Sequence, residues 1–449
     1  MTPVLDRLRG IAGLHVSPGD EGPLVHGVMP AAVAAPETPA AAAEALRLAS
    51  AERWAVELDH GGSPLRLAGR PPERIDLLLT SSRFRDLDDY APADLTASVG
   101  AGAPLGAMAE RFGVHGQWLP LDPPGGPDAT IGATVDSAAA GPLRLAYGTP
   151  RDHVLGLEVV TGDGRVLHFG GRVVKNVAGY DVVKLVIGSR GTLGLVTRVN
   201  VRLRPRPEAD RTLSIAVPSA EVAVEMLRRF RARRVEPAAA ELYSPPMPAS
   251  QDARTWVLLA RVHGSTAAVD EQGRAIEQVA AELGAQPEAT DGPQVWQPLA
   301  QTEALAMVAV RFADLPSEIH ATLALVQAAL PAIEASGGRW TLQAHLGNGI
   351  VRLLGAPDVT GPQAHPATGP SSPLLPSSLA RDWRPLADTI RSARAALAPR
   401  RGTVTLAAAP APLLAEVDPY GPIAGHALMR GIKARFDPAG ILSAGRFVV

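Results

Sequence analysis

The sequence predicts an α+β protein made of two large units, and three observations support this prediction. The chain has 449 residues, more than one ordinary domain of roughly 100 to 200 residues contains. Strand patterns and glycine turns dominate residues 1–207, whereas longer amphipathic helices alternate with strands over residues 208–415. Pro205 and Pro207 mark the boundary, because proline cannot donate to a β-ladder.

The first unit is predicted to contain short strands joined by tight turns. Two apolar runs, 155–160 and 166–169, flank a Thr-Gly-Asp-Gly turn whose residues tolerate positive φ, which predicts a hairpin. Over residues 193–203, apolar residues and a threonine alternate with Arg198, Asn200 and Arg202. This period of two predicts a strand with one buried face.

The second unit is predicted to place helices on one face of an antiparallel sheet. Ser219, Ser265 and Ser317 each precede an amphipathic run and can cap a helix. The order of strands and helices is typical of an α+β layer. Strands are expected at 256–262, 308–312, 340–342, 350–354 and 403–406. Six prolines predict a loop at 355–379, and residues 416–449 form a closing segment with a short helix.

Composition excludes several classes of function. The 43 basic and 45 acidic side chains nearly cancel, whereas a nucleic-acid binder normally carries a basic surplus. The absence of cysteine excludes thiolate nucleophiles, disulfides and a cysteine-ligated iron–sulfur cluster held by this chain. The N-terminus has no signal-peptide core, and no apolar run is long enough for a transmembrane segment. We therefore expect a cytoplasmic protein.

One glycine motif has an alternative interpretation. Gly100, Gly102 and Gly106 follow an apparent strand and precede a helix, as in a dinucleotide-binding fingerprint. Their spacing is GxGxxxG rather than GxGxxG, so this Rossmann interpretation is the weaker one. No P-loop, HExxH or GxSxG motif occurs.

Three further clusters of small residues predict close contact with an anionic ligand. They are His60-Gly-Gly-Ser63 with Gly69, Thr130-Ile-Gly-Ala133 with the alanines before Gly141, and Gly188-Ser-Arg-Gly-Thr-Leu-Gly194. Each alone is more typical of a plain turn. Together they predict a phosphate-bearing cofactor, because small side chains let backbone N–H groups approach an anion.

Several motifs together resemble one family. GRVVKNVAGYD at 171–181, GSRGTLG at 188–194 and LRPRP at 203–207 resemble the FAD-binding domain of the vanillyl-alcohol-oxidase superfamily. Ala129-Thr-Ile-Gly132, Ala140-Gly-Pro-Leu-Arg144 and the closing residues Phe436-Asp-Pro438 and Ala444-Gly-Arg446 agree in order. More narrowly, the chain resembles the smaller flavin-binding subunits of bacterial glycolate oxidases. The middle of the chain, 208–415, matches this family only in its length and in its general pattern of strands and helices.

The resemblance implies a PCMH-type FAD-binding domain in two parts at 1–207, a ferredoxin-like α+β cap at 208–415, and a return of 416–449 to the FAD domain. It implies that the first glycine loop and the Thr130 segment meet the pyrophosphate. Gly141 and Arg144 would lie near the flavin, and 188–196 would lie against adenine and ribose. The implied FAD-binding residues are Gly61, Gly62, Ser63, Gly69, Thr130, Ile131, Gly132, Gly141, Arg144, Gly188, Gly191, Thr192, Gly194, Leu195 and Val196.

Two departures from the family pattern shape the expectations. Covalently flavinylated relatives carry a histidine just after the first loop's glycines, whereas His60 precedes Gly61, so we expect noncovalent FAD. Enzymes for 2-hydroxy acids carry two histidines around a Gly-Asp-Gly-Asn turn that meets a metal. His345 resembles the first of them, but Arg352 stands where the second is expected, so we expect no metal.

Two residues are candidates for contact with substrate. Arg311 lies inside the apolar run 308–312, and a charge on a buried strand needs an anionic partner, either a substrate carboxylate or a protein carboxylate. His345 is the other, although a structural imidazole is the more common interpretation of a lone histidine among apolar residues.

The resemblance therefore predicts an FAD-binding subunit of a complex that oxidises glycolate, a small 2-hydroxy acid, to glyoxylate. It implies a larger homologous flavin subunit and an iron–sulfur subunit as partners, with contact to the inner membrane only through that complex. Two alternatives remain open: a stand-alone FAD-dependent dehydrogenase of another hydroxy acid, and a noncatalytic scaffold with the same fold.

Overall fold

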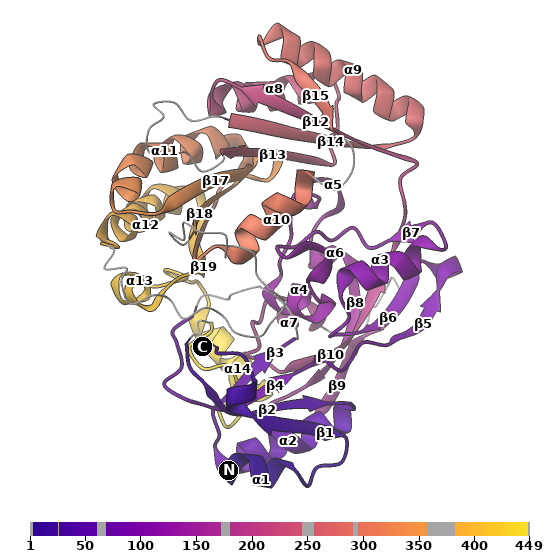
Figure 1. Ribbon diagram of the computed structural model, residues 1–449, viewed down its shortest axis with the longest axis vertical. Coiled ribbons are helices and arrows are strands. Elements are labelled where there is room, and N and C mark those ends of the chain that lie inside the picture. The colour runs from indigo at the N-terminus through magenta and orange to yellow at the C-terminus, as the bar shows by residue number, and fades with distance from the viewer. Residues whose placement is uncertain are drawn as a thin grey trace.

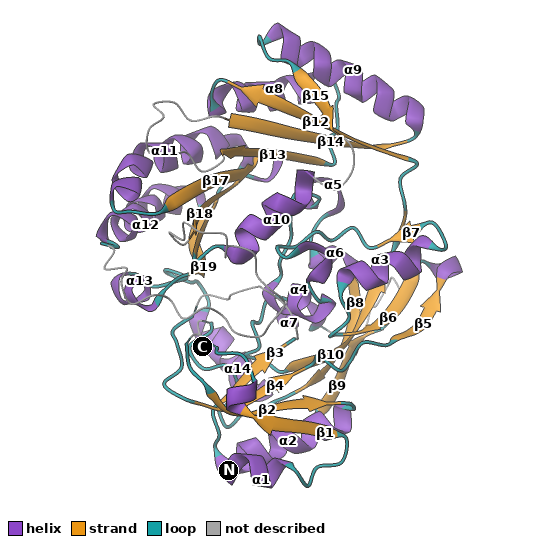
Figure 2. Cartoon of the chain, in the orientation of Figure 1, coloured by secondary structure: helices purple, strands orange, loops and turns teal. Residues whose placement is uncertain are grey.

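The computed structural model describes residues 3–25, 27–60, 69–171, 180–244, 256–290, 295–356 and 382–447. Figure 1 shows two parts: the indigo-to-violet N-terminal part with the yellow C-terminal segment, and a magenta-to-orange part above it. The mixture of helices and strands, visible in Figure 2, confirms the predicted α+β class. The predicted proline-rich loop falls almost wholly on residues 357–381, which lie outside the described residues.

The N-terminal part contains two small sheets with separate cores. The first has the strand order β1-β2-β4-β3 and packs against α1 and α2. Thr38 starts α2 by accepting a hydrogen bond from the Ala41 N–H at 3.1 Å. Its elements are α1 (Pro3–Leu8), β1 (Leu14–Pro18), β2 (Pro30–Pro36), α2 (Pro39–Glu52), β3 (Val56–Asp59) and β4 (Ile75–Thr80).

The second small sheet has the order β5-β6-β10-β8-β9 and is antiparallel throughout. The predicted hairpin is confirmed as β8 and β9, and the alternating strand is confirmed as β10. Short helices pack beside this sheet. The elements are β5 (Leu87–Ala91), β6 (Thr96–Gly100), α3 (Leu105–Gly113), α4 (Ile131–Ser137), α5 (Arg144–Tyr147), α6 (Pro150–His153), β8 (Val154–Val160), β9 (Val166–Gly170), α7 (Val183–Val186) and β10 (Leu195–Arg202).

The upper part is one antiparallel sheet assembled from two βαββαβ units. Strand order is β15-β12-β14-β13 in the first unit and β17-β18-β16-β19 in the second, and β13 pairs with β17 to join them. Each unit therefore has ferredoxin-like order, so the cap is a tandem of the predicted type. The first unit contains β12 (Ala209–Val217), α8 (Ala220–Ala232), β13 (Ala239–Ser244), β14 (Trp256–Gly264), α9 (Thr266–Glu282) and β15 (Pro287–Thr290). The second contains β16 (Val308–Ala313), α11 (Ile319–Ala335), β17 (Arg339–His345), β18 (Ile350–Ala356), α12 (Arg384–Leu397) and β19 (Thr403–Ala408).

Two of the three predicted helix caps are confirmed. Ser219 accepts from the Val222 N–H and Ser265 from the Ala268 N–H. The third prediction is wrong: Glu318, not Ser317, precedes α11. Pro316 begins a 3₁₀ turn that contains Ser317, and the helix grows directly out of that turn.

The two faces of the cap sheet differ in polarity. Along β16, Val308, Val310 and Phe312 point into the core formed with α8, α9, α11 and α12, so Arg311 points to the opposite face. That opposite face is turned toward the N-terminal part, and α10 (Trp296–Leu305) lies over it (Figure 1). The polar face of the cap therefore meets the N-terminal part.

The chain connects the two parts twice. The first crossing follows β11 (Arg204–Pro205), which pairs with β7 (Gln117–Trp118). After α13 (Ala411–Glu416), the C-terminal segment with α14 (His426–Phe436) returns to the N-terminal part, where Leu442 bridges Val56 in parallel. Among the described residues, no helix is long and apolar enough to cross a membrane.

Asp437 fixes this return. Its buried carboxylate accepts hydrogen bonds from the Ile441 and Leu442 N–H groups at 3.1 and 2.8 Å and from Lys433 Nζ at 2.6 Å. These bonds hold the turn that carries Leu442 to Val56.

Replacing Asp437 with alanine should lower the free energy of unfolding of the N-terminal part by about 3 kcal/mol, because it leaves a half-buried ammonium and two N–H groups without their acceptor. Urea unfolding followed by circular dichroism measures this. Asp388→Ala is the control, since the Asp388 side chain is 69% exposed and pairs with Arg391 at the surface. Equal losses in the two variants would contradict the role given to Asp437.

Candidate functional site

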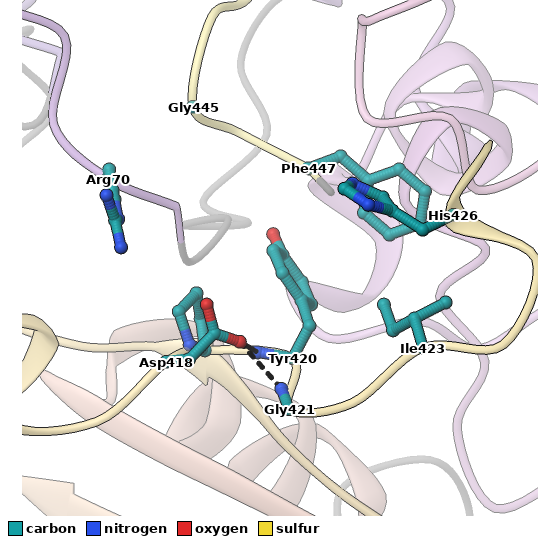
Figure 3. Close-up of a pocket in the computed structure, with 9 residues that line it drawn as sticks. Arg70, Asp418, Tyr420, Gly421, Ile423, His426, Gly445 and Phe447 are labelled. Carbon is teal, nitrogen blue, oxygen red and sulfur yellow. Dashed lines mark hydrogen bonds between the residues drawn. The ribbon is translucent and has the colours of Figure 1, made fainter. Parts of the chain in front are cut away.

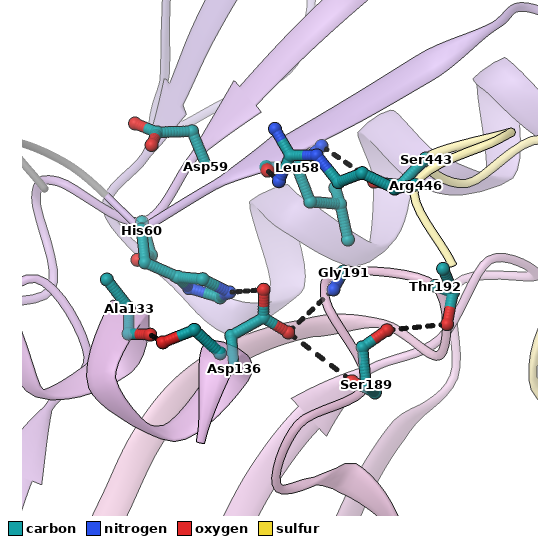
Figure 4. A network of polar contacts seen from close by, with 12 residues as sticks. Leu58, Asp59, His60, Ala133, Asp136, Ser189, Gly191, Thr192, Ser443 and Arg446 are labelled. Atoms are coloured by element: carbon teal, nitrogen blue, oxygen red, sulfur yellow. Dashed lines mark hydrogen bonds and ion pairs between the residues drawn. The ribbon is translucent and has the colours of Figure 1, made fainter. Parts of the chain in front are cut away.

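The glycine-rich segments lie side by side around a buried carboxylate, Asp136 in α4. Figure 4 shows Asp136 between His60 at the end of β3 and the Ser189–Thr192 loop. Asp136 Oδ1 accepts a hydrogen bond from the Gly191 N–H at 2.6 Å, and Oδ2 lies 3.7 Å from His60 Nε2. Burial alone would raise the pKa of Asp136, but the hydrogen bond and charge of His60 together with the Gly191 N–H lower it. An ionised Asp136 thus ties the segments together.

The structure places the predicted cofactor residues as follows. Gly61, Gly62 and Ser63 lie outside the described residues. Thr130 caps α4 and donates to the His60 carbonyl at 3.0 Å. The Gly188 N–H donates to the Val135 carbonyl, and Thr192 Oγ1 donates to the Ser189 carbonyl. Ile131, Leu195 and Val196 are fully buried in apolar cores, so only their backbone is suited to contact a ligand; Gly194 lies in the same strand entry.

Two of the predicted glycines are required by the protein's own packing. A Cβ on Gly132 would lie 2.7 Å from the Ala101 carbonyl oxygen and 3.1 Å from His60 Nδ1. A Cβ on Gly141 would lie 2.0 Å from the Asp122 carbonyl oxygen. Internal contacts therefore account for both glycines, independently of any ligand.

One cavity lies beside Arg70, where the C-terminal segment meets the first part (Figure 3). The Arg70 N–H donates to the Gly445 carbonyl, which holds the two strands of chain together. The cavity measures about 480 Å³ and is lined by Arg70, Asp418, Pro419, Tyr420, Gly421, Ile423, His426, Gly445 and Phe447. Arg190, in the loop that carries Gly191, lies over the Tyr420 ring at 5.2 Å.

The second cavity, of about 430 Å³, lies where the polar face of the cap meets the N-terminal part, and we name it the junction cavity. Gly141 and Pro142 border it from the first part. Five ionisable residues line its polar end: Asp122, Glu241, Glu303, His345 and Arg352. Sequence analysis identified only His345 among these as a candidate for contact with substrate.

His345 and Glu241 form a buried hydrogen-bonded pair across the joint of the two ferredoxin-like units. Register pairs Glu241 in β13 with His345 in β17, and the Glu241 carboxylate contacts His345 Nδ1. Both side chains are at most 2% exposed. His345 Nε2 is buried and has no hydrogen-bond partner among the described residues. Burial, followed by the charge of Arg352, lowers the pKa of His345, so the imidazole stays neutral.

Arg352 connects the cap to the first part. Its Nη1 pairs with Glu303 in α10 at 2.6 Å, and its Nη2 donates to the Ala140 carbonyl at 3.1 Å. Ala140 precedes Gly141, so Arg352 holds the segment that the resemblance assigns to the flavin.

Three more arginines gather on the same side of the cap without a counter-ion. Arg144 in α5, Arg190 and Arg311 are half-buried, and none has a carboxylate within 4.0 Å in the described part of the chain. Burial, followed by the charges of Arg352 and Arg144, lowers the pKa of Arg311 to about 10. Half-buried cations without an anion require one. Arg311 thus faces the junction between the parts rather than the cap's apolar core.

A separate polar chain fixes α5 to the cap. Tyr147 Oη lies 2.9 Å from His263 Nδ1, and His263 Nε2 lies 3.1 Å from the Asp210 carboxylate, which also pairs with Arg261. Trp118 packs edge-on against Tyr147 with ring centroids 5.2 Å apart. Because Tyr147 ends the helix that begins with Arg144, this contact positions the arginine.

Two family models match the chain. Residues 30–170 match an FAD binding domain, and residues 206–334 and 417–447 match the C-terminal domain of FAD linked oxidases.

Similar proteins include two glycolate oxidase subunits. GlcD of Bacillus subtilis (strain 168) is 33% identical over 49% of this chain and 46% of its own length. GlcE of Escherichia coli (strain K12) is 36% identical over 42% of this chain and 51% of its own. D-2-hydroxyglutarate dehydrogenase of Xanthomonas citri pv. viticola is 33% identical over 45% of this chain and 43% of its own. The matches thus span about half the length of these relatives.

The fold also resembles that of solved alkyldihydroxyacetonephosphate synthase structures. One of these structures has a TM-score of 0.63 at 16% sequence identity. The matched region covers 92% of this chain and 77% of the chain in that structure. A second crystal form gives a TM-score of 0.66 at 14% identity, again over 92% of this chain and 76% of its own. At this identity the likeness concerns the fold alone.

Asp122 should make stability depend on pH. It borders the junction cavity and accepts hydrogen bonds from the Gly141 and Leu143 N–H groups at 3.2 and 2.9 Å, yet burial raises its pKa to about 7. The folded state therefore binds more protons than the unfolded state between about pH 4 and pH 7, and stability should fall as pH rises through that window.

Asp122→Asn cannot titrate, so its thermal unfolding midpoint should depend less on pH over the same window, even if the variant is less stable at every pH because one acceptor is lost. Scanning calorimetry between about pH 5 and pH 8 measures both curves. Parallel curves for the two proteins would show that Asp122 stays ionised.

Proposed function

We propose that this chain, which matches models of an FAD binding domain and of the C-terminal domain of FAD linked oxidases, is an FAD-dependent oxidoreductase that oxidises a 2-hydroxy acid in the junction cavity. One observation carries the proposal: His345, whose Nε2 has no hydrogen-bond partner among the described residues, lines the cavity together with Arg352, and Arg311 lies opposite Arg352 in the β16–β18 register. An acid with a hydroxyl on C2 needs both, a cation for its carboxylate and a base for its hydroxyl.

The residues present fit FAD. Its pyrophosphate is a dianion, and Arg144 and Arg190 are half-buried cations without a protein carboxylate within 4.0 Å among the described residues. The Thr130–Gly132 and Gly188–Val196 segments lie beside Asp136, Gly69 lies against Gly445 and Arg446 of the C-terminal segment, and Gly141 borders the junction cavity. We assign these residues to FAD, held noncovalently. Bound FAD supplies the acceptor for the hydride that leaves C2 of the substrate.

The chain's own residues hold the substrate and move its proton. Arg311 and Arg352 attract the carboxylate, and their positions on adjacent strands, directly opposite each other in the β16–β18 register, fix its orientation. His345 Nε2 takes the hydroxyl proton in the state in which an ionised Glu241 accepts a hydrogen bond from Nδ1–H. Burial raises the pKa of Glu241, so the pair supplies this base only at a pH high enough to ionise that carboxyl group. Arg352 and α10 close the cavity toward the cap, which limits access of water.

We further propose that the chain works within a complex that contains a larger homologous flavin subunit and an iron–sulfur subunit, with glycolate oxidised to glyoxylate. The support is that two similar proteins are named as glycolate oxidase subunits. The chain has no cysteine, so a cysteine-ligated cluster that carries electrons onward must belong to another chain.

A second candidate function is a supporting flavin subunit that binds FAD without turnover of its own. Arg352 favours it, because a guanidinium stands where the resemblance places a second histidine, and it is already paired with Glu303.

An absorption spectrum of the purified chain tests the proposal. The expected result is an oxidised flavin spectrum that bleaches when a 2-hydroxy acid such as glycolate or lactate is added without oxygen. The control is a carboxylic acid without the hydroxyl, such as acetate or propionate, which should leave the spectrum oxidised. Bound flavin that no hydroxy acid reduces would favour the supporting subunit.

His345→Gln and Arg311→Leu should separate proton transfer from substrate binding. Loss of the base should slow flavin reduction by about a hundredfold or more with little change in substrate affinity. Loss of the cation should weaken affinity by roughly tenfold to a hundredfold. Stopped-flow reduction over a range of substrate concentrations gives both quantities. His168→Gln and Arg274→Leu, at exposed positions, are the matched controls. A slower rate in both variants with unchanged affinity would contradict the assignment of Arg311.

A further inference from the structure

The junction cavity has an apolar half in addition to its polar end. Seven large apolar side chains line it, contributed by α3, the chain on either side of Leu119, and α10: Leu105, Met108, Trp118, Leu119, Leu121, Trp296 and Leu299. Four prolines complete this wall: Pro123, Pro124, Pro127 and Pro142. Most of the cavity wall is thus suited to hydrocarbon.

The size of the cavity fits the same conclusion. Its volume of about 430 Å³ lies within the range of roughly 300 to 1,000 Å³ that is usual for small-molecule sites. Glycolate carries no side chain on C2. Bound through its carboxylate and hydroxyl at the polar end, it would leave the apolar half to water, which apolar walls do not hold well.

The cavity wall contains both acidic and basic side chains. Asp122, Glu241 and Glu303 border the same space, and Arg352 is paired with Glu303. Arg261, a further cation in the wall, is paired through both nitrogens with Asp210. Arg206 is another cation in the wall, and burial raises the pKa of Asp122, Glu241 and Glu303, so the charges leave the choice of substrate to the apolar lining.

We propose that the preferred substrate is a 2-hydroxy acid with an apolar side chain of several carbons, and that glycolate, although it is oxidised, binds more weakly than such an acid. This inference rests on the proposed oxidation of hydroxy acids and narrows it to a substrate class. The carboxylate and hydroxyl occupy the polar end, and the side chain lies among the leucines and tryptophans.

Binding of a homologous series to the FAD-loaded protein tests this directly. The series is glycolate, lactate, 2-hydroxybutyrate and 2-hydroxyhexanoate, with 2-hydroxyglutarate as the charged comparison. Each added methylene should lower Kd by about fourfold until the apolar half is filled. Isothermal titration calorimetry gives Kd, and quenching of tryptophan fluorescence reports occupancy beside Trp118 and Trp296. Equal Kd values for glycolate and 2-hydroxyhexanoate would overturn the proposal, as would tighter binding of 2-hydroxyglutarate.

Ala300→Leu offers an independent test that removes no existing contact. Ala300 lines the cavity from α10, is half-buried, and lies in a helix that tolerates leucine well. The added side chain should occupy the apolar half and reduce the preference for 2-hydroxyhexanoate over glycolate by about tenfold. Ala281→Leu, the same change on the exposed surface of α9, should leave the preference as it is. An unaltered preference in Ala300→Leu would count against the assignment.

Reduction of the flavin separates the two proposals. If affinity rises with side-chain length but no acid bleaches the flavin, the proposed oxidation fails and the binding preference stands. If glycolate and 2-hydroxyhexanoate bleach the flavin with equal efficiency at low concentration, the oxidation stands and the substrate class is wrong.

Discussion

The junction between the two parts concentrates positive charge that the protein does not neutralise, and the rest of the site depends on this constraint. Arg144, Arg190 and Arg311 come from segments distant in sequence, and their mutual repulsion contributes to the lowered pKa of Arg311. Within the described ranges, none of the three has a carboxylate at ion-pair distance. Half-buried cations of this kind are costly without an anion. A phosphate-bearing cofactor and a carboxylate substrate would together supply the missing negative charge. This is consistent with the position of Gly141, which borders the junction cavity.

The tandem architecture of the cap explains how these residues reach the junction. Each ferredoxin-like unit covers one face of its sheet with helices, so the polar residues of both units share the opposite face. Joining the units through β13 and β17 brings Glu241 opposite His345, and the β16–β18 register brings Arg311 opposite Arg352. A buried polar pair such as Glu241 and His345 adds little to the free energy of unfolding compared with apolar packing. Its presence at the joint is therefore better explained by the orientation of His345 than by a contribution to folding.

Sequence patterns predicted helices and strands more successfully than they predicted contacts between residues that are distant in sequence. The alternation in β10, the turn between β8 and β9 and two serine caps were readable because each is a local effect of backbone geometry. Arg311 could be singled out because a charge interrupts an apolar strand. Glu241, Asp122 and Glu303 could not, because their roles depend on strand order and on a helix packed across it. The glycine clusters could be found in the sequence, but one reason for two of the glycines could not. Gly132 and Gly141 are also required by close contacts within the folded protein, and no local pattern reveals such contacts.

Arg352 determines what kind of chemistry the junction can support. An arginine cannot ligate a metal ion, and Nδ1 of His345 is already occupied by Glu241, so both positions of the two-histidine pattern are engaged with carboxyl groups. A guanidinium nevertheless supplies a permanent positive charge for an anionic substrate. The same charge contributes, after burial, to the lowered pKa of His345 and keeps the imidazole neutral. One side chain therefore promotes both requirements of a base-assisted oxidation, since it attracts the carboxylate and leaves the neighbouring nitrogen free to accept a proton.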